Sequence, residues 1–245
     1  FVPTMGALHE GHLALLLKAK KQSSVVVCSI FVNPTQFDSK KDFNRYPDTL
    51  SDDITKLEKI NCDVLYIPAV ADLYAINEKA KHFNFNGLDN VMEGKFRKGH
   101  FDGVATIIEK FFNIIKPHKA YFGQKDLQQL LIVKSLTKQL NLPIEIVSVP
   151  TIREENGLAM SSRNKLLNAK QKLVASMLYE SLAFCKANKD TFTIGELKTH
   201  LEKQFSEQLE VDLEYLEFVD ANNLQNISFF QENNNAICIA AYLGG

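Results

Sequence analysis

A stretch near the start of the chain, Pro3 to His12, carries two histidines and two glycines at spacings suited to phosphate chemistry. His9 and His12 lie three positions apart, so both imidazoles would face one side of a helical turn. There they can donate hydrogen bonds to negative charge that develops on a phosphate. Gly6 and Gly11 allow a close backbone approach, and a helix start favours an anion. The stretch predicts a strand, a tight turn and a helix start with a phosphate site.

Other interpretations of the same stretch stay open. A strand–turn–helix with two histidines is compatible with a purely structural role, and the glycine pattern typical of dinucleotide sites is absent. Zinc binding by His9 and His12 is possible in principle, but no third ligand stands at a typical spacing.

Polar residues follow two further strand-like runs. Residues 24–32 form an apolar, β-branched run that ends at Asn33, with Gln36 shortly after it. Residues 119–123 form another, followed by Lys125 and Asp126. In open α/β sheets ligands lie beyond the carboxyl ends of the strands, so these side chains are expected to face a ligand.

Strand-like and helix-like segments alternate over the first 150 residues, which predicts an α/β fold with a parallel, Rossmann-like sheet of about five strands. We also expect an added strand over residues 82–86 and a basic loop over residues 94–102. The expected helices span residues 13–21, 48–60, 101–116 and 125–140, and the further strands span 63–67 and 143–149.

The pattern changes past Thr151, which divides the chain into expected domains of residues 1–151 and 152–245. Two helices, near residues 169–187 and 193–208, precede two strands. The expected second domain is therefore a smaller α+β unit, with strands near residues 213–219 and 236–243.

Composition narrows the class of protein. The 245 residues carry a formal net charge of −1, which gives no argument for nucleic acid or an anionic membrane as partner. No apolar run reaches the length of a membrane span, and no signal peptide is visible. Four scattered cysteines without a C-x-x-C pair favour a reduced, cytoplasmic setting.

The motifs resemble those of a known enzyme family. His9-Glu10-Gly11-His12 resembles the H-x-G-H signature of the nucleotidylyltransferase superfamily, whose fold is the HUP type. Four further motifs narrow the match to the pantothenate synthetase (pantoate–β-alanine ligase) family, in the family's order and over essentially the whole chain. They are Phe31-Val32-Asn33-Pro34-Thr35-Gln36-Phe37, Gly99-His100-Phe101-Asp102-Gly103-Val104, Phe122-Gly123-Gln124-Lys125-Asp126-Leu127-Gln128-Gln129 and Met160-Ser161-Ser162-Arg163-Asn164.

The resemblance implies a reaction in two steps. Pantoate attacks the α-phosphorus of ATP to give pantoyl adenylate and pyrophosphate, and β-alanine then displaces AMP to give pantothenate. It further implies Mg²⁺ as cofactor and a homodimer formed through the first domain. Because the family's chains normally begin with a helix and the start of the first strand, we expect that an N-terminal segment is missing from this sequence.

The resemblance also assigns roles to residues. The expected catalytic residues are His9, His12, Lys125, Ser161, Ser162 and Arg163. ATP would also contact Pro3, Thr4, Met5, Gly6, Gly123, Asp126, Ile152 and Met160. Pantoate would contact Met5, Asn33, Gln36 and Gln129. Asp52 and Asp53 match a carboxylate position linked to Mg²⁺, although carboxylates early in a helix also favour its dipole.

Rival functions remain to be weighed. The nearest rival function is that of another nucleotidyl-transferring enzyme. A tRNA synthetase, however, would need an anticodon-binding region and usually a basic surface, and this chain has neither the length nor the charge for them. A regulatory nucleotide-binding module would be expected to have lost some of His9, His12, Lys125 and Arg163, which are all present. A purely structural domain leaves the polar strand ends unexplained. The Met160–Asn164 segment is expected to act as a lid that excludes water from the adenylate.

Overall fold

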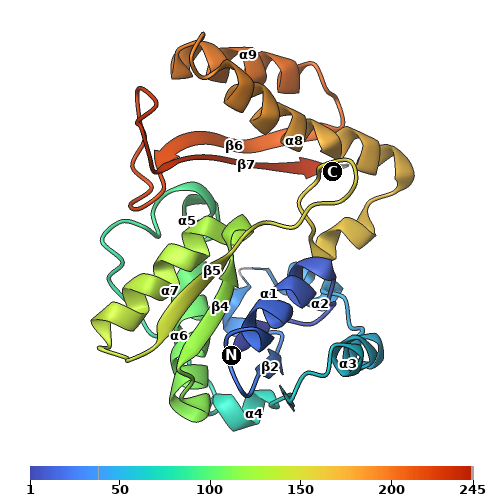
Figure 1. The fold of residues 1–245 in the computed structure, drawn as a ribbon, viewed down its shortest axis with the longest axis vertical. Coiled ribbons are helices and arrows are strands. Elements are labelled where there is room, and N and C mark those ends of the chain that lie inside the picture. The colour runs from blue at the N-terminus through green and yellow to red at the C-terminus, as the bar shows by residue number, and fades with distance from the viewer. Residues whose placement is uncertain (38, 244–245) are drawn as a thin grey trace. The chain divides into compact units, whose positions relative to one another are not determined.

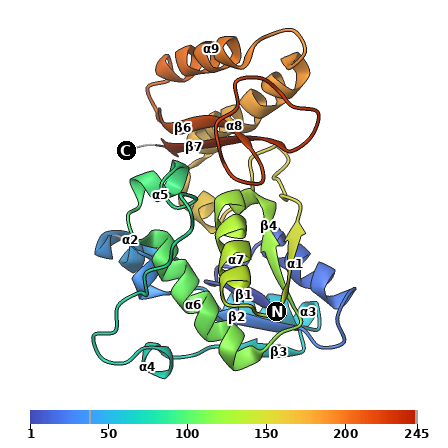
Figure 2. The ribbon, with the colours of Figure 1, turned by 90° about the vertical axis from the view of Figure 1, so that its left-hand side faces the viewer.

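Five short strands within the first part of the chain form a three-stranded and a two-stranded parallel sheet that lie side by side, with helices on both faces (Figures 1 and 2). The computed structural model describes residues 1–37 and 39–243. The backbone nitrogen of Tyr121 donates to the carbonyl of Phe1 at 3.0 Å and joins the two strand groups in the order β3-β2-β1-β4-β5. The expected Rossmann-like parallel sheet is confirmed. The strands are β1 (Val2–Thr4), β2 (Val27–Ile30), β3 (Val64–Tyr66), β4 (Lys119–Gly123) and β5 (Glu145–Val149).

Side chains that alternate along the strands pack into two separate hydrophobic cores, one on each face of the sheet. Phe1, Ala120 and Phe122 pack with helices α6 and α7 on one face of the sheet. Val2 and Tyr121 pack with α1 and α3 on the other. A strand that is covered on both faces needs apolar side chains at nearly every position, which explains the apolar run of residues 24–32. The helices of this part are α1 (Glu10–Lys20), α2 (Lys40–Arg45), α3 (Leu50–Lys59), α4 (Val70–Leu73), α5 (Met92–Phe96), α6 (His100–Ile115) and α7 (Leu127–Gln139), with 3-10 turns η1 (Pro34–Gln36) and η2 (Gln124–Asp126).

Two local expectations are wrong. Residues 82–86 do not form a strand, because the chain there bonds to the side chains of α6 and not to a neighbouring strand. The backbone nitrogen of Lys81 donates to Thr106 Oγ1 at 2.8 Å, and that of Phe83 donates to Asp102 Oδ1 at 3.1 Å. The segment expected as a basic loop, residues 94–102, contains the end of α5 and the first residues of α6.

Helix α6 and the turn η1 pack with their backbones unusually close. A Cβ atom added to Gly103 would lie 2.3 Å from the carbonyl oxygen of Thr35. Glycine is therefore required at this position by the approach of another backbone, because a β-carbon there would push the turn off the helix.

Replacing Gly103 by alanine is expected to lower the free energy of unfolding by about 1–3 kcal/mol, through overpacking against a backbone that cannot yield cheaply. Denaturant unfolding measures this. Gly195→Ala is the matched control, because a Cβ there would meet only Thr193 Oγ1 at 4.0 Å. Alanine in a helix should raise stability at that position by about 0.4–1 kcal/mol. Equal effects of the two substitutions would contradict the steric argument.

The chain forms two compact units, Phe1–Ile152 and a second unit from Arg153 onward. The second unit is α+β: its two strands pair antiparallel, and Leu197, Leu201 and Phe205 of α9 join Leu216 and Phe218 of β6 in its core. Its elements are η3 (Ser162–Leu166), α8 (Ala169–Asn188), α9 (Ile194–Ser206), β6 (Val211–Asp220) and β7 (Asn235–Leu243).

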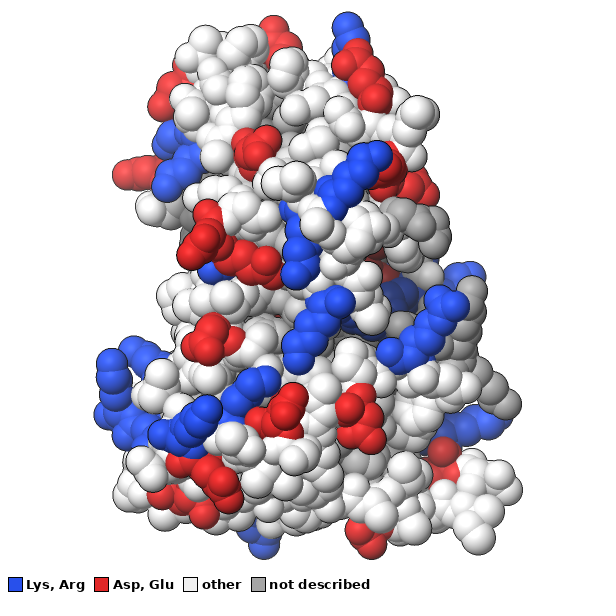
Figure 3. Space-filling model, turned by 90° about the vertical axis from the view of Figure 1, so that its right-hand side faces the viewer, with Lys and Arg blue, Asp and Glu red and all other residues white. Residues whose placement is uncertain are grey.

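The surface mixes charges of both signs. On the face drawn in Figure 3, basic and acidic side chains are interspersed. None of the helices in the described part of the chain has both the length and the apolar composition needed to cross a membrane.

Candidate active site

The glycine-containing turn after β1 holds a left-handed backbone. Gly6 has φ +82° and Ala7 has φ +49°, a region that residues with a β-carbon rarely adopt. Thr4 is buried, and its hydroxyl donates to Ser29 O at 2.7 Å and accepts from Gly6 N at 3.2 Å. Thr4 therefore shapes the turn with its side chain, and its expected contact with ATP stays a prediction.

Asp53 fixes this turn from helix α3. Asp53 is 1% exposed, and its carboxylate accepts from the backbone nitrogens of Ala7 and Leu8, each at 2.7 Å. Thr49 Oγ1 donates to the same group at 3.3 Å, and Lys56 Nζ donates to Leu8 O at 2.8 Å. The left-handed turn is thus held by a buried carboxylate and, one helical turn later, by an ammonium group.

The two histidines form the N-terminal cap of α1. His9 is the N-cap residue, and its Nδ1 accepts from Gly11 N at 3.1 Å. His12 Nδ1 accepts from His9 N at 3.3 Å, so each ring occupies one otherwise unsatisfied backbone donor. The ring centroids are 4.0 Å apart. The expectation that both imidazoles share one side of the helix start is confirmed by this contact.

The cap determines where the histidine protons lie. An Nδ1 atom that accepts a hydrogen bond carries no proton, so a neutral ring bears its proton on Nε2. Burial, and next the charge of His9, lowers the pKa of His12 to about 3. His12 is consequently a neutral Nε2–H donor at physiological pH.

Lysines and one aspartate set the potential around His12. The charges of Asp126, Lys125 and Lys56 all act on its pKa, which places η2 and α3 close to the histidine pair. Lys125 Nζ lies 2.9 Å from Asp126 Oδ1. Three separated segments of sequence therefore bring donors and positive charge to one end of the sheet, a combination suited to a polyphosphate.

The residues expected to bind pantoate differ in how far their side chains are exposed. Gln36 and Gln129 are partly buried, on η1 and α7, which both pack against α6. Gln128, the neighbour of Gln129, is a structural residue whose Nε2 donates to Leu88 O and Val91 O. Asn33 is 1% exposed, and its amide bonds to Gly103 O and to the Tyr74 hydroxyl, so it has a structural role and its contact with pantoate stays a prediction.

The remaining expected residues lie at the end of the first unit or in the second. Met160 is partly buried and Ser162 buried, whereas the Arg163 side chain is exposed. Ser161 caps η3 by accepting from Arg163 N at 3.3 Å, and Asn164 Nδ2 donates to Glu154 Oε1 at 2.6 Å. This segment is therefore held within its own unit. Ile152 is the last residue of the first unit.

The metal assignment fits the side chains poorly. Both oxygens of Asp53 already accept backbone hydrogen bonds, and Asp52 is exposed on α3. Among the described residues, no three His, Cys, Asp or Glu side chains are grouped so that they could hold a metal ion.

Sequence reasoning missed three residues that support the site. Lys56 follows Asp53 by one helical turn, and this spacing on the helix was a usable signal. His100 and Tyr74 contact the η1 turn, as described below. Their partners are distant in the chain, and the sequence held no local signal for Tyr74.

The parallel strands and the histidine-capped helix after β1 form the arrangement expected of a nucleotidylyltransferase-type α/β protein. The family described as pantoate-β-alanine ligase matches residues 1–245, and the chain belongs to that family. Curated relatives named pantothenate synthetase are 45% identical in Cytophaga hutchinsonii (100% of this chain, 87% of the relative) and 43% in Christiangramia forsetii (100% and 87%).

Solved structures agree with the family assignment. A crystal structure of the enzyme from Thermus thermophilus matches with a TM-score of 0.92 and 37% identity, over 99% of this chain and 88% of the other. A ligase from Francisella tularensis, complexed with β-γ ATP and β-alanine, matches with a TM-score of 0.81 and 36% identity, over 99% and 84%. The chain is an enzyme of the family that joins pantoate to β-alanine in an ATP-dependent reaction.

Proposed function

We propose that this chain binds ATP and makes pantothenate through a pantoyl adenylate. A pantoate carboxylate oxygen attacks the α-phosphorus, the bond to the β-phosphate oxygen breaks, and pyrophosphate leaves. The β-alanine amine then attacks the acyl carbon, loses a proton, and AMP leaves. The observation that carries this proposal is the histidine pair on the cap of α1, in which His12 is neutral and close to the charges of Lys125 and Lys56.

Each group of residues has a stated part in this proposal. His9 and His12 donate from Nε2 to oxygens of the reacting phosphate, and Lys125 offsets its negative charge. The backbone of Pro3 to Gly6, with Gly123, Asp126 and Ile152, holds the nucleoside and phosphates. Gln36 and Gln129 hold pantoate, next to Met5. Ser161, Ser162 and Arg163 reach the phosphates from a lid formed by the second domain, residues 152–245, beginning near Met160.

In this proposal Mg²⁺ is bound to the phosphates of the substrate ATP and arrives together with it. In ATP enzymes the ion binds mainly through the phosphates, water and one or two carboxylates. Because Asp53 serves the turn, the triphosphate is the principal ligand, and Asp52 is the carboxylate left to assist. No chemical step is assigned to the ion.

Pyrophosphate exchange tests the adenylate directly. With β-alanine omitted, labelled pyrophosphate should exchange into ATP only when pantoate is present. Lys125→Met should slow exchange about 10- to 100-fold, as expected for a charge-assisted hydrogen bond of about 1.5–3 kcal/mol. Lys134→Met is the matched control, because Lys134 is exposed on α7 and should change nothing. Exchange without pantoate, or none while pantothenate still forms, would contradict the adenylate route.

We further propose a homodimer through the first domain and a cytoplasmic location, where ATP is available. Strand β3 lies at the edge of the sheet, and Val64, Ile67 and Val70 along and just after it are 44–47% exposed. An apolar sheet edge of this kind is usually covered by a partner. Sedimentation velocity distinguishes a dimer from a monomer.

A further inference from the structure

The turn η1 carries Gln36 and is anchored to helix α6 at both ends. Asn33 Nδ2 donates to Gly103 O at 3.1 Å. His100, which is 4% exposed, lies with Nδ1 2.8 Å from Gln36 O, and because a carbonyl only accepts, Nδ1 is the donor. Among the described residues, the backbone bonds within the turn run from Gln36 N to Asn33 O and from Phe37 N to Pro34 O. Side chains therefore fix where this turn lies.

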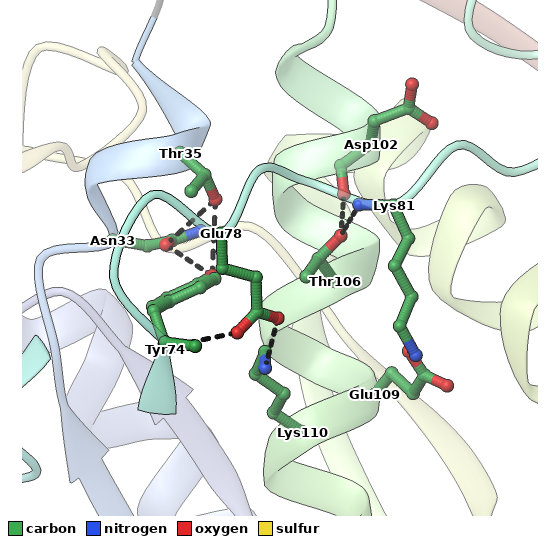
Figure 4. A network of polar contacts seen from close by, with 10 residues as sticks. Asn33, Thr35, Tyr74, Glu78, Lys81, Asp102, Thr106, Glu109 and Lys110 are labelled. Carbon is green, nitrogen blue, oxygen red and sulfur yellow. Dashed lines mark hydrogen bonds and ion pairs between the residues drawn. The ribbon is translucent and has the colours of Figure 1, made fainter. Parts of the chain in front are cut away.

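Tyr74, directly after α4, completes this anchorage from a third segment. Its hydroxyl donates to Asn33 Oδ1 at 2.8 Å, and Thr35 Oγ1 donates to the same oxygen at 3.1 Å. Figure 4 shows these three side chains pointing toward one another. The Tyr74 ring stacks on Phe31, and burial raises the pKa of its phenol, so the hydroxyl remains a donor.

The position of Tyr74 is itself determined by α6. Glu78 Oε2 accepts from Ala75 N at 2.8 Å, and Glu78 Oε1 pairs with Lys110 Nζ at 2.7 Å (Figure 4). Lys110 Nζ also lies 4.9 Å from the centre of the Tyr74 ring. The contacts of Glu78 and Lys110 therefore hold the Tyr74 segment on α6. The Tyr74 hydroxyl thus has a fixed position that does not depend on where the turn η1 lies.

We propose that Tyr74 is a positioning residue for pantoate: its hydrogen bond to Asn33 holds the Pro34–Gln36 turn where the Gln36 amide meets the substrate. The inference rests on the proposed role of Gln36 in binding pantoate. Without the phenol hydroxyl, the hydrogen bond that remains to Asn33 Oδ1 among the described residues comes from Thr35 Oγ1, and Thr35 belongs to the turn itself. The turn then loses its link to the segment after α4.

Tyr74→Phe tests this in the full chain, because it removes only the hydroxyl. The KM for pantoate should rise about tenfold, the ratio that corresponds to a hydrogen bond of about 1.4 kcal/mol, while the KM for ATP stays within about twofold. Simple loss of folded protein would lower kcat and leave both KM values unchanged. Tyr66→Phe is the control: its ring also packs on the core at Phe111, and the described residues give its hydroxyl no hydrogen-bond partner.

Two further variants keep the test decisive. Thr35→Val removes the second contact between the turn and Tyr74, because Thr35 Oγ1 lies 3.2 Å from the Tyr74 hydroxyl. It should raise the pantoate KM in the same direction, which supplies the answer if Tyr74→Phe fails to fold. Gln36→Ala tests the underlying role: an unchanged pantoate KM there rejects the proposed function of Gln36. A raised KM in Gln36→Ala with unchanged values in Tyr74→Phe and Thr35→Val overturns the positioning role alone.

Discussion

Replacing His12 by asparagine is expected to lower kcat/KM about 10²- to 10³-fold, as for the loss of one preorganised transition-state donor, while the protein stays folded. Asparagine Oδ1 can take the place of Nδ1 and accept from His9 N, so the helix cap survives. The Nε2–H donor has no counterpart in asparagine and is lost. The substitution thus separates the structural half of the imidazole from the half that we assign to the phosphate.

His9→Asn makes the same separation at the N-cap itself. Asparagine is among the best N-cap residues, so the bond from Gly11 N is kept and stability should not fall. Activity should still fall about 10²- to 10³-fold. Steady-state kinetics and thermal unfolding of both asparagine variants, with His12→Ala as the variant that loses cap and donor together, measure the two effects. Activity within tenfold of the parent in His12→Asn would rule out the donor role.

The pH dependence of stability provides a second measurement on His12. Its pKa is lowered from 6.5 to about 3 in the folded protein. Between these values the unfolded chain binds a proton that the folded chain does not, so the free energy of unfolding falls as the pH falls. Asparagine does not titrate, so any stability advantage of the parent over His12→Asn should shrink from pH 6.5 toward pH 3. An advantage that grows with acid would contradict a neutral His12.

Periodicity in the sequence predicted the five strands of the first unit and its long helices, but not the short helices α2, α4 and α5. The apolar run of residues 24–32 predicted a strand covered on both faces, and β2 lies in the sheet between β1 and β3. Residues 82–86 show the limit of the method. Their alternating pattern is that of a strand, but Asp102 and Thr106 of α6 take the backbone donors that a ladder would need. A competing partner on a distant helix leaves no trace in the local pattern.

In the candidate site, too, features set by local spacing could be predicted and features set by distant partners could not. The histidine spacing and the polar strand ends could be predicted, because their geometry follows from a helical turn and a parallel sheet. The roles of Asn33 and Asp53 could not, because each depends on a partner far away in the chain. Asn33 was expected to face substrate but bonds to Gly103 and Tyr74. Asp53 was expected near a metal ion but bonds to the backbone of Ala7 and Leu8.

Asp53→Asn is expected to lower the free energy of unfolding by about 2–4 kcal/mol, because two charge-assisted hydrogen bonds are disturbed inside the protein. An amide has one acceptor oxygen, so its NH₂ group must face one of the two backbone donors. The turn that precedes His9 then shifts, and a shift of about 1 Å is enough to lower kcat/KM about 10²-fold. Denaturant unfolding and steady-state kinetics measure both quantities.

The magnesium dependence decides between positioning and metal ligation for Asp53. A lost metal ligand should raise the Mg²⁺ concentration needed for activity, and excess Mg²⁺ should restore much of the rate. A displaced turn should leave the rate low at every Mg²⁺ concentration. Asp52→Asn is the matched control, because Asp52 is exposed on the same helix and its replacement should change stability by no more than about 0.5 kcal/mol. Recovery of Asp53→Asn at high Mg²⁺ would return Asp53 to the metal site, and its absence would leave the carboxylate as the anchor of the turn.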